Sequence, residues 1–138
     1  MYRILELNPQ LVPFSDNIDL RMNLYRNTKN RLLTAGQDLK DFANGHNFYG
    51  FHHVEGGWYY REWAPSADQL YLEGEFNNWN PTSHPMKRLD GENWELYLPG
   101  DDALWHGCKV KTVVDYHGSR TDHLPLYIRR VIQNKSNN

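Results

Sequence analysis

The sequence QLYLEGEFNNWN, residues 69–80, contains the clearest structural signal in the chain. Its apolar and small residues recur at every second position up to Phe76, which is the period of a β-strand with one buried face. Asn tolerates turn conformations, so Asn77-Asn78 predicts a chain reversal directly after this strand. Trp79 then falls on a polar turn, where a large ring is available for contact with a ligand.

The two-residue period continues on both sides of this stretch. Gly56-Gly57 separates two alternating segments and predicts a hairpin, and His117-Gly118 predicts another turn. Short strands with frequent turns and no helical crossovers favour an all-β fold, an immunoglobulin-like antiparallel β-sandwich over residues 46–133. The predicted strands cover residues 51–54, 58–63, 69–76, 93–98, 109–116 and 127–132.

Residues 1–45 follow a different, helical pattern and are predicted to form a short N-terminal helical extension. We expect a loop up to Pro13, an N-cap at Ser15 and a helix that stops at Gly36. Residues 38–43 predict a second, short helix. The apolar stripe of the first helix is expected to pack on the sandwich; its members are Ile18, Met22, Tyr25 and Leu32. The polar residues 134–138 are predicted to be a disordered tail.

Composition excludes several classes of function. The formal net charge is −2, which argues against a nucleic-acid partner because such partners require a basic face. The single Cys108 leaves no internal disulfide. No apolar run approaches the roughly 20 residues of a membrane helix, and MYRILELNPQ does not resemble a signal peptide, so we expect a cytoplasmic protein without a membrane partner. The histidines show no metal-ligand spacing, and we expect no metal and no cofactor.

Four segments, in this order, resemble carbohydrate-binding module family 48. They are Arg61 to Pro65, Leu70 to Asn80, Asn93 to Pro99 and His106 to Lys111. A module of this kind precedes the catalytic barrel of glycoside hydrolase family 13 enzymes, and a related one occurs in the beta subunit of AMP-activated kinase. Glu62-Trp63-Ala64-Pro65 and Tyr127 to Val131 are similar to the corresponding parts of 1,4-alpha-glucan branching enzymes.

The resemblance implies a non-catalytic module that binds α-1,4-glucan, such as glycogen, starch or a maltooligosaccharide, and docks on the catalytic barrel of a branching enzyme. A barrel needs about 250 residues, so we expect no enzymatic activity from 138 residues alone. The alternative is a structural interaction domain that packs on the barrel without binding sugar. A module without its barrel is also expected to expose an apolar patch and to form a weak homodimer.

The resemblance and the turn chemistry together nominate Trp79, Asn78 and Asn80 as carbohydrate-binding residues. The Trp79 ring would stack on glucose while the amides bond its hydroxyls; alternatively, Trp79 folds back as a lid on the core. Lys111 aligns with a lysine that contacts glucan in the kinase module. The second tryptophan of that module would fall near Ser119-Arg120 and is absent. This difference leaves three alternatives. Either the affinity for glucan is weak, or Tyr97 or Tyr116 substitutes for the missing ring, or the sugar site has decayed.

One enzymatic reading rests on Glu73 and Glu75, which lie two residues apart on one strand. Glycoside hydrolysis uses a pair of carboxylates about 5–10 Å apart. Such chemistry also needs a deep groove, which the sequence does not predict. A solvent-exposed strand face is therefore the favoured interpretation of the two residues.

Overall fold

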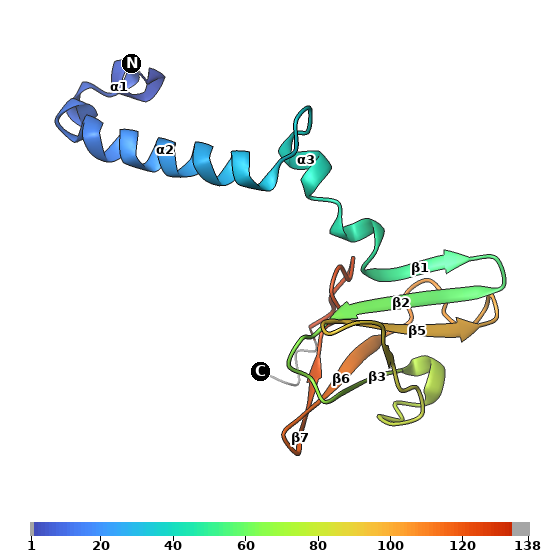
Figure 1. The fold of residues 1–138 in the computed structure, drawn as a ribbon. Helices are drawn as coiled ribbons and strands as arrows, with labels where there is room; N and C mark the ends of the chain where they lie inside the picture. The colour runs from blue at the N-terminus through green and yellow to red at the C-terminus, as the bar shows by residue number, and fades with distance from the viewer. Residues whose placement is uncertain (1, 134–138) are drawn as a thin grey trace. The chain divides into compact units, whose positions relative to one another are not determined.

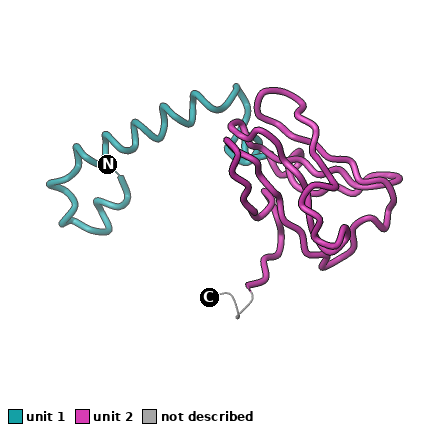
Figure 2. The backbone as a smooth tube through the Cα atoms, turned by 90° about the horizontal axis from the view of Figure 1, so that it is seen from below, with its two compact units in different colours: residues 1–44 teal, residues 45–138 magenta. Residues whose placement is uncertain are grey.

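The structure is a computed structural model that describes residues 2–133. The tail predicted at 134–138 lies outside the described residues. The chain divides into a helical unit, residues 1–44, and a β unit, residues 45–138 (Figure 2). Each unit is described separately.

The helical unit contains α1 (Arg3–Leu7), a 3-10 helix η1 (Pro9–Phe14), α2 (Ser15–Leu32) and α3 (Leu39–Phe42) (Figure 1). The loop predicted up to Pro13 is therefore wrong. Pro9 sits in the first turn of η1, where a missing N–H costs nothing. The N-cap predicted at Ser15 is also wrong: η1 runs directly into α2, so Ser15 already has helical backbone angles and Phe14 occupies the cap position.

The second predicted helix is present as α3, and its start is well specified. The Asp38 side chain accepts hydrogen bonds from the N–H groups of Lys40 and Asp41, and the Asp41 carboxylate accepts one from the Asp38 N–H. This reciprocal arrangement satisfies N–H groups that a helix leaves unpaired. Every residue of α2 is exposed or half-exposed, and the packing of its apolar stripe on the sandwich stays a prediction.

Two antiparallel sheets form the β unit, which confirms the predicted all-β, immunoglobulin-like sandwich (Figure 1). Sheet A has the order β1-β2-β5-β4, and sheet B has the order β3-β6-β7. The strands are β1 (Gly50–Val54), β2 (Gly57–Trp63), β3 (Gln69–Gly74), β4 (Lys87–Arg88), β5 (Asn93–Pro99), β6 (Val110–Tyr116) and β7 (Ser119–His123). Two further 3-10 turns are η2 (Gly45–Asn47) and η3 (Glu75–Asn77).

The core lies between the sheets and is built from inward-facing residues of both. Tyr60 and Trp94 from sheet A meet Leu70 and Leu72 from sheet B, and all four are buried. The segment before β4 crosses from one sheet to the other: the Met86 N–H bonds to the Leu70 carbonyl, and β4 then pairs with β5. This crossing closes one side of the sandwich.

Both predicted chain reversals are present, although the first is centred on Glu55-Gly56, and Gly57 is already the first residue of β2. Val54 pairs with Gly57 around Glu55-Gly56, and Tyr116 pairs with Ser119 around His117-Gly118. In the second turn both central residues have positive φ, at 47° and 80°, as a type I′ turn requires. The turn folds the following residues back onto β6 as strand β7.

Three sequence expectations are corrected by the fold. The last strand is Ser119–His123, not 127–132, because the chain leaves sheet B at Leu124 and Tyr127 has a positive φ of 55°. The strand predicted over 69–76 stops at Gly74, and Phe76 lies half-buried in η3. Glu73 is buried at 6% exposure, so it does not lie on a solvent-exposed strand face as expected.

Candidate functional site

The turn that follows β3 is organised by the side chain of Asn77. Its carboxamide oxygen accepts the Gly74 N–H at 2.9 Å, and its nitrogen donates to the carbonyls of Leu72 and Asn80, both at 3.1 Å. A side chain that bonds the backbone on both sides of a reversal competes with continued strand pairing. This competition explains why β3 ends two residues before the sequence pattern does.

Trp79 is held in an unusual backbone conformation on this turn. Asn78 and Trp79 have φ values of 54° and 58°, both in the left-handed region. Asn enters that region readily, whereas a bulky residue does so at a cost of order 1–3 kcal/mol. The Trp79 N–H bonds to the Gly74 carbonyl at 2.8 Å, which fixes the residue in place. Its side chain is 41% exposed, so Trp79 is not a lid on the core.

The neighbouring asparagines are both exposed but differ in their bonding. The Asn80 side-chain oxygen accepts hydrogen bonds from the Thr82 N–H and hydroxyl at 3.1 and 3.2 Å. Within residues 2–133, the Asn78 side chain has no hydrogen-bond partner. The turn therefore carries two exposed amide side chains, one on each side of Trp79 in the sequence.

Lys111 lies on β6 at the register position opposite Glu73. Its ammonium is 3.0 Å from an Asp122 carboxylate oxygen on β7, and the side chain is 43% exposed. Gly74, whose carbonyl accepts the Trp79 N–H, pairs with Val110, the residue before Lys111. Strand register therefore brings Lys111 and Trp79 to the same end of sheet B. In the described chain, no hydrogen bond or ring contact joins Lys111 directly to Trp79.

Glu73 and Glu75 do not form a catalytic pair. Glu75 lies in η3 and accepts the Lys109 N–H at 3.0 Å, and the Lys109 ammonium is 3.2 Å away. These interactions lower the pKa of Glu75. Burial raises the pKa of Glu73, which remains on β3 opposite Lys111. The Glu75 carboxylate thus interacts with Lys109, and Glu73 is buried. The geometry offers no acid and base that face a shared substrate position.

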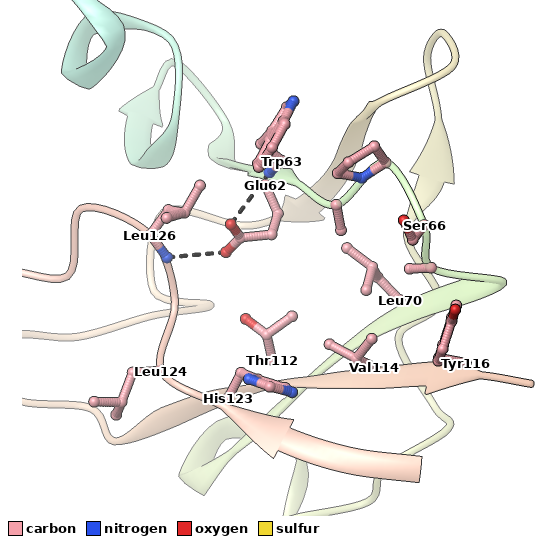
Figure 3. Close-up of a pocket in the computed structure, with 13 residues that line it drawn as sticks. Glu62, Trp63, Ser66, Leu70, Thr112, Val114, Tyr116, His123, Leu124 and Leu126 are labelled. Carbon is pink, nitrogen blue, oxygen red and sulfur yellow. Dashed lines mark hydrogen bonds between the residues drawn. The ribbon is translucent and has the colours of Figure 1, made fainter. Parts of the chain in front are cut away.

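A second feature, missed by the sequence reasoning, is a pocket of about 430 Å³ between the sheets (Figure 3). Its wall carries Glu62, which is 6% exposed. The Glu62 carboxylate accepts hydrogen bonds from the Tyr60 hydroxyl, the Trp63 N–H at 3.2 Å and the Leu126 N–H at 2.9 Å. The Tyr60 hydroxyl also bonds to Thr112. The sequence pattern that could have revealed this network is the two-residue period of β2, which places Tyr60 and Glu62 on the same, inward side.

This network ties three parts of the β unit together. Tyr60 and Glu62 belong to β2 of sheet A, Thr112 belongs to β6 of sheet B, and Leu126 lies beyond β7. A buried carboxylate is tolerated only where its oxygens are hydrogen-bonded, as they are here. Glu62 therefore serves as a structural link between the sheets and the segment that follows β7.

We expect a pH signature from this link. Burial raises the pKa of Glu62 above its ordinary value, and the hydrogen bonds that it accepts oppose part of that increase. The folded chain then binds this proton more tightly than the unfolded chain, so stability is lost as pH rises from the unfolded to the folded pKa. The free energy of unfolding of the parent minus that of Glu62→Gln should fall with rising pH across a window that begins at about pH 4.3.

Urea unfolding of both chains between pH 4 and pH 8 measures this difference. His123 lies close enough to lower the Glu62 pKa, and His123→Gln in both backgrounds removes that contribution. If the difference in unfolding free energy stays constant or increases with pH, burial does not control the pKa of Glu62.

Metal ligation and membrane spanning have no counterpart in residues 2–133. No group of three or more His, Cys, Asp or Glu side chains is arranged to hold a metal ion. In the same range, none of the helices has the length and apolar character needed to cross a bilayer.

Comparison with known proteins relates the β unit to a protein family. Residues 48–128 match the model of the family described as carbohydrate-binding module 48 (isoamylase N-terminal domain). Relatives named 1,4-alpha-glucan-branching enzyme include one from Dictyostelium discoideum, 36% identical over 98% of this chain and 21% of its own length. Another, from Felis catus, is 38% identical over 81% of this chain and 17% of its own length.

A third relative, 1,4-alpha-glucan-branching enzyme 2-2, chloroplastic/amyloplastic, from Arabidopsis thaliana, is 33% identical over 95% of this chain and 17% of its own length. The chain thus spans about a fifth of the length of these relatives. The family match covers most of the β unit, with sheets A and B both inside it. The chain therefore belongs to the carbohydrate-binding module 48 family.

Proposed function

We propose that the chain binds α-1,4-glucan at the turn after β3, with Trp79 stacking on glucose and Asn78, Asn80 and Lys111 bonding its hydroxyls. The observation that carries the proposal is the exposed Trp79, held in a left-handed conformation between two exposed amides. Backbone strain of this kind persists where the surrounding structure enforces it, often at ligand-binding positions. A rigid aromatic face with adjacent hydrogen-bonding groups suits a sugar ring, which has an apolar face and a polar edge.

We further propose that the chain acts as a non-catalytic module of a 1,4-alpha-glucan branching enzyme. Such an enzyme cuts an α-1,4 linkage and rejoins the fragment through an α-1,6 bond, and the module would keep the polymer close to the catalytic barrel. Support comes from the names of the relatives and from the share of their length that the chain covers. Glycogen, starch and maltooligosaccharides all present the same α-1,4-linked glucose units.

The alternative is a structural domain that packs on the barrel without binding sugar. It is favoured by the exposed apolar side chains that follow β7, namely Leu124, Tyr127, Val131 and Ile132. The same residues support the proposal of a weak homodimer when no barrel is present. A cytoplasmic location stays a prediction, since the names of two relatives include chloroplastic/amyloplastic.

Glucan binding by the whole chain is the direct test. We expect retardation in native gels that contain glycogen, and a dissociation constant on the order of 0.1–10 mM for maltoheptaose by isothermal titration. The affinity is weak because one stacked ring must offset the ordering of the ligand and the loss of bound water. Cellohexaose, which has β-1,4 linkages, is the matched control. Equal migration with and without glycogen, together with no heat of binding, would support the purely structural alternative.

A further inference from the structure

The outer face of sheet A carries a continuous row of aromatic and charged side chains. We name it the outer-face row and define it as Phe48, Tyr59, Arg61, Glu95 and Tyr97. Strand register pairs Tyr59 with Tyr97 and Arg61 with Glu95. Because side chains alternate along a strand and Tyr60 is buried in the core, these two pairs face away from it.

Contacts along the row hold its rings in fixed positions. The rings of Tyr59 and Tyr97 lie 5.0 Å apart. The Arg61 guanidinium is 4.8 Å from the ring centres of both Tyr59 and Phe48, and it bonds to a Glu95 carboxylate oxygen at 2.7 Å. Ring, guanidinium and ring therefore alternate along the row, and the arginine is fixed by both stacking and an ion pair.

The end of the row at Tyr97 depends on a glycine. A Cβ at Gly57 would lie 2.8 Å from the Tyr97 hydroxyl oxygen and 2.9 Å from the adjacent ring carbon. The ring therefore lies close over the bare backbone of β2, and its hydroxyl donates to the Gly56 carbonyl at 2.9 Å. Tyr97 nevertheless remains 42% exposed. Its rotamer is thus fixed while much of the ring stays available to a ligand.

We propose that the outer-face row is a second α-glucan-binding surface, distinct from the turn at Trp79. From Gly57 to Arg61 the row follows β2 for about 13 Å, enough for an extended ligand rather than a single sugar. Rings offer stacking to the apolar face of glucose, and Arg61 and Glu95 offer a donor and an acceptor for hydroxyls. The two charges compensate each other, which matches a neutral ligand and not a phosphate backbone.

The two surfaces belong to different sheets, since Trp79 follows β3 of sheet B whereas the row lies on sheet A. A long or branched glucan can engage both, so binding to the polymer gains from effective concentration. We expect an apparent affinity for glycogen, per glucan end, at least tenfold above that for maltoheptaose. This inference rests on the proposed glucan-binding function but can fail independently of it.

Maltoheptaose titration of the ¹⁵N-labelled whole chain, followed by amide shifts, separates the two surfaces. We expect two groups of shifted amides, one in 57–61 and 95–99 and one in 77–82. Tyr97→Leu keeps an apolar side chain over Gly57 but removes the ring, and should weaken the first group at least fivefold while leaving the second unchanged. Trp79→Ala should have the converse effect. Tyr97→Phe, which keeps the ring, should preserve the first group and controls for misfolding.

Each outcome decides between the surfaces. Shifts in both groups that respond separately to the two variants support the second surface. Shifts confined to 77–82 overturn it and leave the proposed site at Trp79 intact. Shifts confined to 57–61 and 95–99 support it and refute the assignment of Trp79. If neither group shifts, both proposed surfaces are overturned.

Discussion

Trp79→Ala is expected to abolish the binding component at the turn after β3 while leaving the fold intact. Trp79 is 41% exposed and lies on a turn, so removal of its ring takes little volume from the core. The left-handed backbone is enforced by the bond from the Trp79 N–H to the Gly74 carbonyl, which alanine retains. Amide shifts in 77–82 on addition of maltoheptaose measure the loss, and circular dichroism with thermal unfolding reports on the fold.

Two further variants separate sugar contact from backbone strain. Trp79→Gly adopts the left-handed conformation without a steric penalty, so it should lose the same binding component at equal or higher stability than Trp79→Ala. Trp105→Ala removes an equally large exposed ring, 51% exposed, from another loop and should retain binding. If Trp79→Ala unfolds the chain, the ring is structural. If it folds and still shows the 77–82 shifts, the site lies elsewhere.

Gly74→Ala is expected to produce the largest loss of stability among the single substitutions considered. A Cβ at Gly74 would lie 2.3 Å from the Lys109 carbonyl oxygen and 2.9 Å from a Val110 methyl carbon. The first of these neighbours is backbone, so the chain at Lys109, directly before β6, must move away from the end of β3 to admit it. Overpacking typically costs about 1–3 kcal/mol, and a backbone clash places this variant at or above the upper end.

A loss of about 3 kcal/mol corresponds to a decrease of about 10 °C in melting temperature for a domain of this size. Gly74→Ala should also weaken glucan binding, because the Gly74 carbonyl holds Trp79. The matched control is Gly91→Ala, where an added Cβ meets nothing within 4 Å and φ is not positive. That variant should stay within about 0.5 kcal/mol of the parent. Equal melting temperatures for the two variants would contradict the close approach at Gly74.

The sandwich itself was predictable because its signals are local. Alternation of buried and exposed residues specifies a strand within a few positions, as in β5, where Trp94 and Leu98 face the core. The turns at Glu55-Gly56 and His117-Gly118 were equally clear, since few residues accept positive φ. The predicted reversal at Asn77-Asn78 also has a local cause, the tolerance of asparagine for turn conformations.

Other features depend on residues distant in the chain. The last strand was misplaced because 127–132 has an apolar pattern of its own. Ser119–His123, by contrast, is exposed at every position and is a strand only through pairing with β6. The close approach of Tyr97 to Gly57 involves residues 40 positions apart, which no local pattern records. Likewise, Glu73 is an ordinary polar strand residue in sequence, and its burial follows from its neighbours on sheet B.

The sequence by itself therefore determined the fold class and the presence of helices before the sandwich, and it nominated the residues for sugar contact. Period, turn chemistry and family motifs all lie within short segments of the chain. Only the tertiary structure decided that Trp79 is exposed in a strained left-handed turn, that Glu62 joins the Tyr60 hydroxyl to the Leu126 N–H, and that an outer-face row lies on sheet A. Each of these depends on how separate strands meet, and strand pairing is a long-range property that the free energy of the whole β unit determines.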